Sequence, residues 1–286
     1  ATVSRRDSSA HGPSVPITHV DLEFYQNEGY LIVREAFTPN RISALAAAVE
    51  RIMDRAIAGE VEIGWIDRAQ RAIGRTGHLL NPDLYDPAFA EWLDQDLAPH
   101  LHHLVAGGKV RHSLFNMLAG GAGQEYKQRW HRDLGRAGGD DEGAFLQRHH
   151  GKLVQFNAPL QPGDHYLQIV PNSHLRASTA AELEAAADKS GATGMPGALI
   201  VMLEPGDIVY YNANLWHRGW NPTGRKRWTM HAAFWTADYP VMKHEHGQRA
   251  ALLTAGHMDR MPPITRQYVQ RYLDQYTDDA VEIFDL

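Results

Sequence analysis

The chain has 286 residues, of which 43% are hydrophobic and 22% are charged, as is typical of a soluble globular protein with a sizeable core. A net charge of -6, with basic residues scattered along the chain, argues against nucleic-acid binding. The absence of cysteine excludes disulfides, thiolate catalysis and cysteine-bound metals. Any metal must therefore be bound by His, Asp or Glu, and 17 histidines supply many candidates.

Residues 1–16 are polar and rich in Ser, Arg and Pro, so we expect a flexible N-terminal arm. No apolar stretch has the pattern of a signal peptide or the length of a membrane span. These observations predict a cytoplasmic protein without a membrane partner.

Residues 17–108 have the pattern of a helical region. Apolar residues at helical spacing predict a short helix over 18–29, followed by a strand over 30–33. Thr38-Pro39 and Asp86-Pro87 each place a capping side chain before a proline, so both are expected to begin helices.

The pattern changes at about residue 109 to short apolar runs separated by turns rich in Gly and Pro. Short strands at this spacing predict a sandwich or barrel, interrupted by one helix over 180–189. A helical tail is expected over 238–286. We therefore expect one domain over 17–286, mainly β with flanking helices, whose strands cover residues 110–118, 152–158, 166–170, 198–203, 207–211 and 228–235.

Three His-x-Asp triplets occur, beginning at His19, His131 and His257, and only the second follows a strand-rich region. Residues two apart on an extended chain point to the same side, so one cation can bind His131 and Asp133 together. His217, which closes a turn, a strand and a short loop, is the candidate third ligand. Two histidines and one carboxylate match the triad that leaves three positions open on Fe(II). The alternative is that these are ordinary hydrogen-bonded histidines.

A basic triplet, Arg225-Lys226-Arg227, follows His217 and precedes an apolar run. An arginine can bind a carboxylate through two parallel hydrogen bonds, which a lysine cannot do in the same way. If the strand begins at Arg225, both arginines share a face with His231, and at least one is expected to point inward. The alternative is a solvated basic loop.

Together these motifs resemble the phytanoyl-CoA dioxygenase-like family of Fe(II)- and 2-oxoglutarate-dependent oxygenases. The resemblance covers residues 18–237 and implies a double-stranded β-helix, a cupin-like jelly-roll core over about 109–237. Its motifs, in chain order, are residues 21–33, Trp130-His131-Arg132-Asp133, Pro171-Asn172-Ser173-His174, Pro205-Gly206-Asp207 and Leu215-Trp216-His217.

The resemblance also implies a ligand set. It assigns His131, Asp133 and His217 to Fe(II), with 2-oxoglutarate on two of the open positions and its far carboxylate on an arginine. Arg225 fits the family position best and Arg227 second, although the interval from His217 to Arg225 is short and Gly219 stands where the family often has Ser. Further candidate contacts to the cosubstrate are the polar side chains of Asn116, Gln128 and Gln155.

The implied reaction is oxidative decarboxylation of 2-oxoglutarate by O2 to succinate and CO2, coupled to oxidation of an unactivated C–H bond in a small-molecule metabolite. The presence of Asp133 favours hydroxylation over halogenation, because related halogenases replace that carboxylate with a small residue. Desaturation, epoxidation and ring formation use the same iron site and stay open. Two other classes also stay open, namely a cupin-like metalloenzyme that does not use 2-oxoglutarate, such as an isomerase, and a catalytically silent ligand-binding barrel.

The sequence says little about the substrate. Residues 134–151 are rich in glycine and charge, and their place after two ligands suggests a mobile lid. Arginines in and near this segment favour an anionic small molecule, with a solvated charged loop as the alternative. These arginines are Arg129, Arg132, Arg136 and Arg148. The oligomeric state is open, with a homodimer as one candidate.

Overall fold

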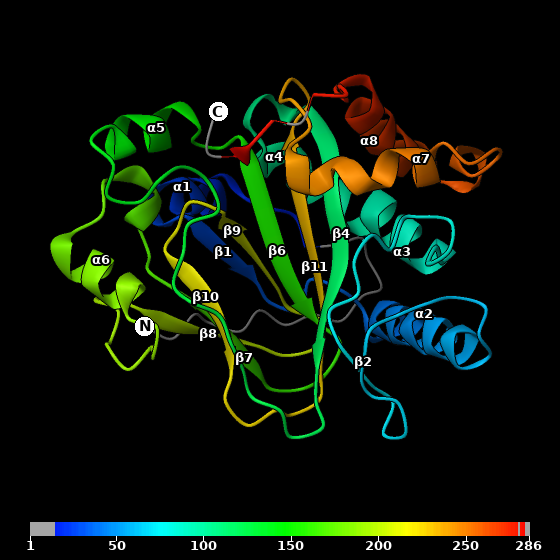
Figure 1. The fold of residues 1–286 in the computed structure, drawn as a ribbon. Coiled ribbons are helices and arrows are strands. Elements are labelled where there is room, and N and C mark those ends of the chain that lie inside the picture. The colour runs from blue at the N-terminus through cyan, green and yellow to red at the C-terminus, as the bar shows by residue number, and fades with distance from the viewer. Residues whose placement is uncertain (1–14, 280, 284–286) are drawn as a thin grey trace.

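The computed structural model describes residues 15–279 and 281–283, so the expected arm over 1–16 lies almost entirely outside the described residues. Figure 1 shows strands at the centre of the molecule, flanked by helices on two sides. Among the described residues, no helix is both long enough and apolar enough to cross a membrane.

Two antiparallel sheets form the centre. The larger has the order β1-β9-β6-β11-β4 and the smaller β5-β10-β7-β8, while β2 and β3 pair separately. This arrangement confirms the predicted jelly-roll class, and it contains every strand that the apolar runs indicated. The bounds are β1 Tyr30–Val33, β2 Trp65–Asp67, β3 Ala72–Ile73, β4 Val110–Gly120, β5 Tyr126–Lys127, β6 Leu153–Pro159, β7 Asp164–Ile169, β8 Leu199–Leu203, β9 Ile208–Asn212, β10 His217–Asn221 and β11 Arg227–Thr236.

The helices begin where the sequence places caps. Thr18 forms a capping box at the start of α1, and Thr38 and Asp86 cap α2 and α3 ahead of their prolines. A π-helical turn, Leu93–Leu97, joins α3 to α4. The bounds are α1 His19–Glu28, α2 Pro39–Ile57, α3 Pro87–Trp92, α4 Ala98–Leu104, α5 Glu142–Arg148, α6 Ala180–Ala187, α7 Arg249–Leu252 and α8 Pro263–Asp274.

Gly29 ends α1 in a left-handed conformation, with φ of 80°. A Cβ atom added there would lie 2.5 Å from Nδ1 of the buried His174. Glycine is therefore required for two reasons, the backbone angle and the close approach of the His174 ring.

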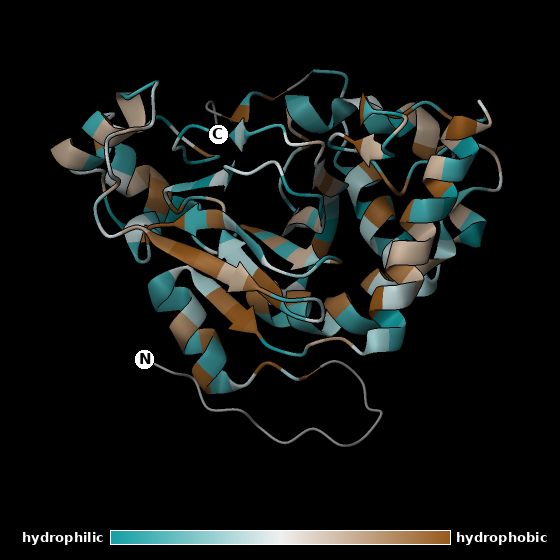
Figure 2. Ribbon diagram, turned by 90° about the horizontal axis from the view of Figure 1, so that it is seen from below, coloured by the Kyte–Doolittle hydropathy of each residue, from teal (hydrophilic) through white to brown (hydrophobic). Residues whose placement is uncertain are grey.

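Alternation along β11 divides the interior in two. Met230, Ala232 and Phe234 pack in the main hydrophobic core with α2, α3, α4 and α8, whereas Arg227 and His231 face the other way. Figure 2 shows the strands as largely hydrophobic and the outer helices as mixed in character. The main core extends from α1 to α8, and on this basis we propose that residues 17–286 form one domain.

Candidate metal and cosubstrate site

Backbone pairing brings the three expected metal ligands together. His131 and His217, which begins β10, form an antiparallel bridge with N–H···O=C hydrogen bonds of 3.1 and 3.0 Å. The Asp133 N–H donates to the Ala213 carbonyl at 2.9 Å. Residues two apart in the first segment thus lie beside the start of β10, as their spacing predicts.

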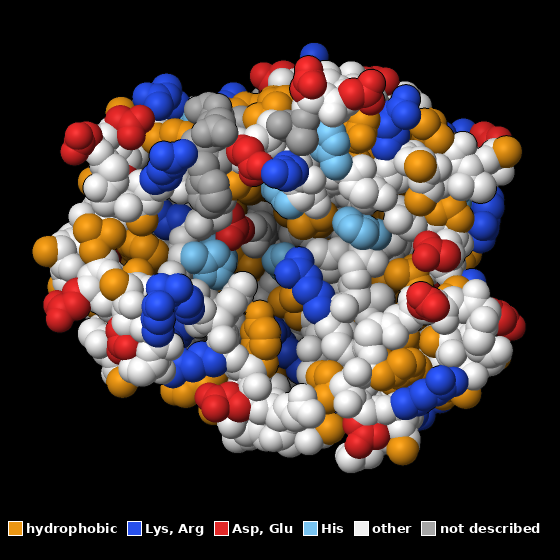
Figure 3. Space-filling view, in the orientation of Figure 1, with side chains coloured by type: hydrophobic (Ala, Val, Ile, Leu, Met, Phe, Trp, Pro, Cys, Tyr) orange, Lys and Arg blue, Asp and Glu red, His pale blue; other side chains and the backbone are white. Residues whose placement is uncertain are grey.

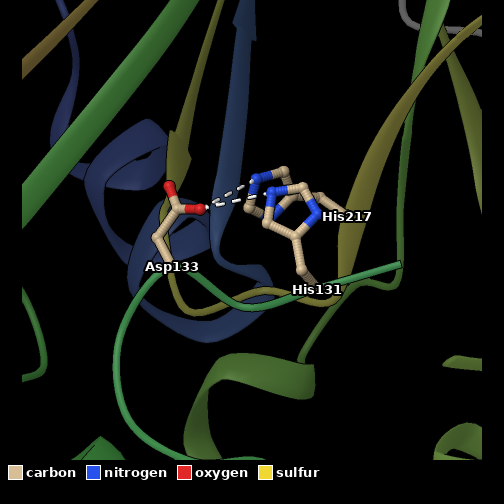
Figure 4. Close-up of side chains that lie close together, drawn as sticks. All are labelled: His131, Asp133 and His217. Carbon is tan, nitrogen blue, oxygen red and sulfur yellow. Dashed lines mark ion pairs between the residues drawn. The ribbon is translucent and has the colours of Figure 1, made fainter. Parts of the chain in front are cut away.

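The three side chains converge on one point (Figure 4). Asp133 Oδ1 lies 3.3 Å from His131 Nε2 and 3.7 Å from His217 Nε2, and all three candidate ligand atoms lie within 4.8 Å of one another. First-row metals bind such atoms at about 2.0–2.2 Å, so this spacing can accommodate one ion. The residues fit a two-histidine, one-carboxylate centre of the kind found in non-haem Fe(II) oxygenases.

The hydrogen bonds of the two histidines leave the correct nitrogens for a metal. His131 Nδ1 lies 2.8 Å from the Arg129 carbonyl, and His217 Nδ1 lies 2.9 Å from the Leu215 carbonyl. A carbonyl oxygen only accepts, so each Nδ1 must carry the proton. In each neutral ring the lone pair then belongs to Nε2, which faces Asp133.

Burial and mutual charge hold His217 and Asp133 in metal-binding forms, whereas the pKa of His131 is raised, because the hydrogen bond and charge of Asp133 outweigh burial. Burial, together with the neighbouring His131, lowers the pKa of His217 to about 4. Burial acts to raise the pKa of Asp133, but the two histidines and Gln155 outweigh it and hold that pKa far below its ordinary value. His217 is therefore neutral and Asp133 ionised near neutral pH.

Gln155 orients the carboxylate. Its Nε2 donates a hydrogen bond to Asp133 Oδ2, which leaves Oδ1 directed at the two histidines. Gln128, three residues before His131, accepts a hydrogen bond from the Gly219 N–H at 3.2 Å. Both glutamines line the cavity beside the triad, where the sequence predicted cosubstrate contacts.

The triad opens into a cavity of about 480 Å³ between the two sheets, in the size range of small-molecule sites. Figure 3 shows the corresponding face hollowed near its centre, with histidines and basic side chains around the hollow. The polar side chains that line it, apart from the triad and the two glutamines, include Arg75, Ser113, Asn157, Tyr211, Asn221, Arg227, His231 and His244.

The two candidate arginines lie in different surroundings. Arg225 is exposed, and its Nη2 donates to the Pro162 carbonyl at 3.4 Å. Arg227 is buried, with 5% of its surface exposed, and lines the cavity. Residues 222–226 form the connection between β10 and β11, so β11 begins at Arg227, one residue before the strand expected over 228–235 and two residues after the start at Arg225 that was considered for the basic triplet. The structure therefore places Arg227, not the favoured Arg225, inside.

Arg227 is hydrogen-bonded on one side only, and its Cζ lies over the Tyr166 ring, 5.2 Å from the ring centre. Its Nε donates to Asp164 Oδ2 and to Thr229 Oγ1, each at 3.1 Å, and the Thr229 hydroxyl also donates to Asp164. Among the described residues, no hydrogen bond is found for the two terminal nitrogens of Arg227. A buried guanidinium held in this way can offer both terminal nitrogens to a carboxylate.

Two other sequence candidates have structural roles. Asn116 lies outside the cavity lining, and its Oδ1 accepts from the His78 N–H at 3.0 Å. Arg132 is buried and donates to the Ser173 and Asn214 carbonyls at 2.7 and 2.5 Å, while Glu142 of α5 lies 3.1 Å from its Nε. Arg132 thus anchors the segment over 134–151 and is not available to a substrate.

Sequence reasoning missed several cavity residues. Arg75 follows β3, where the pairing of Thr76 with Met117 places it beside the cavity; no hydrogen bond or ion pair is found for it within the described ranges. No local signal identifies this residue. His231 was within reach of sequence analysis, because it alternates with Arg227 and Thr229 along β11.

His231 is held as a neutral ring. Its Nδ1 lies 2.9 Å from Asn157 Oδ1 and 3.0 Å from the Phe156 carbonyl. Burial lowers the pKa of His231 to about 3, and the charges of Arg75 and Arg227 act in the same direction. The cavity lining thus contains a neutral imidazole together with the two arginines.

Comparison with known proteins places the chain in a family. The model of the phytanoyl-CoA dioxygenase (PhyH) family matches residues 25–227, which is most of the chain. The protein therefore belongs to the phytanoyl-CoA dioxygenase family, as the motifs indicated. It is an oxidoreductase that depends on Fe(II) and 2-oxoglutarate.

Solved structures agree with this fold. EctD from S. alaskensis, solved with 2-oxoglutarate and 5-hydroxyectoine, is 15% identical with a TM-score of 0.57, covering 82% of this chain and 81% of its own. SnoK, a non-haem α-ketoglutarate-dependent carbocyclase from nogalamycin biosynthesis, is 16% identical with a TM-score of 0.58, covering 88% and 95%. AviO1 from Streptomyces viridochromogenes Tue57 is 20% identical with a TM-score of 0.52, covering 79% and 99%. A search of curated proteins found no match.

Proposed function

We propose that this dioxygenase oxidises an unactivated C–H bond of a small-molecule metabolite, with His131, Asp133 and His217 as the iron ligands. The observation that carries the proposal is the convergence of this triad and the buried Arg227 on one cavity. Iron bound there would activate O2 with 2-oxoglutarate as the reductant. The protein's own part is to hold the ligands, bind the cosubstrate and exclude water.

Arg227 is proposed to bind the distal carboxylate of 2-oxoglutarate. Its Nε side is held by Asp164 and Thr229, so the terminal nitrogens have a fixed direction before the cosubstrate arrives. A preorganised fork loses little side-chain freedom on binding, which favours bidentate recognition. Arg225 is exposed and bonded to Pro162, so it is not proposed for this role.

Arg75 supplies the second positive charge of the cavity. The charge of Arg227 is largely offset by Asp164 at 3.1 Å, whereas Arg75 has no acidic partner among the described residues. A dicarboxylate such as 2-oxoglutarate carries two negative charges. The iron and Arg75 can attract these charges, while the hydrogen bonds of Arg227 orient the distal carboxylate. We therefore propose that Arg75 contributes to cosubstrate affinity.

The test is anaerobic reconstitution of the full chain with Fe(II), followed by titration with 2-oxoglutarate. The iron chelate of 2-oxoglutarate gives a weak visible absorption band, and exposure to air should then release succinate. A saturable band and succinate formation are the expected results. Folded, iron-loaded protein that forms neither would contradict the proposal and favour a cupin-like metalloenzyme that does not use 2-oxoglutarate.

A catalytically silent ligand-binding barrel is the other class that the absence of the band would favour. Neither this barrel nor a cupin-like metalloenzyme that does not use 2-oxoglutarate is expected to form the chelate or to release succinate. The measurement therefore separates the proposed oxygenase from both alternatives.

A further inference from the structure

The cavity changes character along its length. The register of β6 and β11 places Asn157 opposite His231, but Leu153 opposite Trp235. On the other side of β11, Leu114 of β4 lies opposite Ala233. The lining near Arg227 thus combines polar side chains with Leu118, which lies opposite Thr229, whereas the lining of these strands beyond His231 is mainly apolar.

The apolar end is defined here by five cavity-lining residues, which belong to one hydrophobic cluster. Three of them are nearly inaccessible to solvent, with 5%, 4% and 0% exposed for Leu153, Ala233 and Trp235. His244, whose side chain is exposed, also lines the cavity. The five residues are Leu114, Leu153, Ala233, Trp235 and Ile283.

Ile283 comes from the C-terminal segment, far from the other four in sequence. Val281 forms a parallel bridge with Met242, and its carbonyl accepts from the Lys243 N–H at 2.8 Å. An ion pair of 2.5 Å between Lys243 and Glu282 adds a second attachment. The segment over 281–283 is therefore held against the residues after β11, with Ile283 directed at the cavity.

These surroundings select against charge. A charged group at this end would lose its hydration without gaining a partner, whereas a hydrocarbon group gains by leaving water. Asp133 and Gln155 mark the boundary between the two ends, so a hydrocarbon group bound here lies next to the proposed iron site.

We propose that the apolar end binds the hydrocarbon part of the substrate, and that Ile283 of the C-terminal segment is a specificity-determining wall of that site. This inference rests on the proposed function, because only that function identifies the molecule bound at the apolar end as the substrate. The substrate class is a small molecule that presents an uncharged aliphatic or aromatic group to the metal, with any polar group at the rim near His244.

The test uses N-phenyl-1-naphthylamine, an uncharged apolar fluorophore, titrated into the full chain both before metal addition and as the anaerobic Fe(II)·2-oxoglutarate form. We expect one saturable site with enhanced fluorescence. Ile283→Asp places a charge in the apolar end and should weaken probe binding at least about tenfold. Ile283→Trp, which fills the same space without charge, should weaken it as well.

Ile200→Asp is the matched control, because Ile200 lies on β8 outside the cavity lining and is 53% exposed. It should leave the probe affinity unchanged. Equal affinity in the wild type and both Ile283 variants, or equal weakening by Ile200→Asp, would overturn the inference. Circular dichroism establishes that each variant is folded.

The inference and the proposed function fail in different ways. Probe binding to metal-free protein requires neither iron nor 2-oxoglutarate, and Ile283→Asp should keep the iron–2-oxoglutarate band. A band without an Ile283-dependent probe site would overturn the inference alone. A probe site that depends on Ile283 in protein that forms no band would overturn the proposed function and leave the apolar site standing.

Discussion

The two ends of the cavity are built on the same strands, β4, β6 and β11, yet they hold their side chains in different ways. At the polar end, Arg227 and His231 are fixed by hydrogen bonds to buried partners. At the apolar end, Leu153 and Trp235 are fixed by packing alone. Hydrogen bonds give direction, whereas packing gives shape, so the polar end should respond to loss of a charged or hydrogen-bonding partner, and the apolar end to an introduced charge or a change of volume.

The largest effect is expected where the two ends meet. Asp133→Ala removes a proposed metal ligand, whereas Gln155→Ala removes only the hydrogen bond that orients it. Loss of such an orienting partner typically costs about 10–100-fold in metal affinity or activity, and loss of the ligand should cost more. Fe(II) binding and succinate release measure both variants.

Fold integrity is the control for this pair, because both side chains line a cavity and their removal leaves the main core unchanged. A folded Asp133→Ala enzyme with near-normal turnover would show that the ligand assignment is wrong. His131→Ala should behave as Asp133→Ala does.

The buried pair of Asp164 and Arg227 should give the next largest effect. Asp164→Asn keeps an oxygen that accepts from Arg227 Nε but removes the compensating charge. Leaving a buried charge unpaired typically costs about 3 kcal/mol or more in the free energy of unfolding. 2-Oxoglutarate should then bind more tightly than in the wild type and restore part of the lost stability.

Denaturant unfolding with and without 2-oxoglutarate tests this expectation. Thr229→Val serves as the control, because it removes a hydroxyl that contacts both members of the pair without changing charge. If Asp164→Asn bound 2-oxoglutarate no more tightly than the wild type, the charge of Asp164 would not limit the attraction of Arg227 for the cosubstrate.

The polar end should also make stability depend on pH. Burial lowers the pKa of His231 to about 3, below the unfolded value of about 6.5. The unfolded chain therefore binds the proton first, so the contribution is complete above pH 6.5 and is lost as pH falls towards 3. Between pH 7 and pH 5 the loss is about 2 kcal/mol for this residue.

The measurement compares the free energies of unfolding of the wild type and His231→Gln at pH 7 and pH 5. From pH 7 to pH 5, the free energy of unfolding of the wild type should fall by about 2 kcal/mol more than that of the variant. His19→Gln is the control, because His19 is exposed at the start of α1. If the difference in free energy of unfolding between the wild type and His231→Gln were the same at both pH values, His231 would not be held neutral by burial.

A smaller effect is expected from volume alone at the apolar end. Ile283→Ala removes methyl and methylene groups from a partly buried side chain, with an expected loss of about 1 kcal/mol, or about fivefold in probe affinity. Fluorescence titration measures it. An unchanged affinity would show that Ile283 does not contact the bound hydrocarbon group.

The sequence predicted the pairing of His131 with Asp133 because its determinant is local, whereas the assignment of His217, which reaches them through a long-range bridge, came with the family resemblance. His131 and Asp133 share a face of an extended segment, and His217 follows a turn and a strand that are both visible in the sequence. The apolar runs and the turns rich in Gly and Pro marked the strands and predicted a sandwich or barrel, and the family resemblance narrowed this to a jelly-roll.

The alternation along the strand placed Arg225 and Arg227 on one face and did not choose between them, and the preference for Arg225 came from the family resemblance. Arg227 lies inside because the connection from β10 extends through residue 226, which leaves Arg225 outside the strand. Arg75 and Ile283 were not predictable, since each reaches the cavity through a non-local contact, Thr76 with Met117 and Met242 with Val281.

The central claim is that Arg227, oriented by Asp164, binds the distal carboxylate of 2-oxoglutarate next to the triad. It is tested most directly by anaerobic titration of the iron–2-oxoglutarate band in Arg227→Ala and Arg225→Ala. We predict that Arg227→Ala weakens 2-oxoglutarate binding about 10–100-fold and that Arg225→Ala leaves it unchanged, because only Arg227 lines the cavity. The opposite pattern, with Arg225→Ala the weaker binder, would contradict the account.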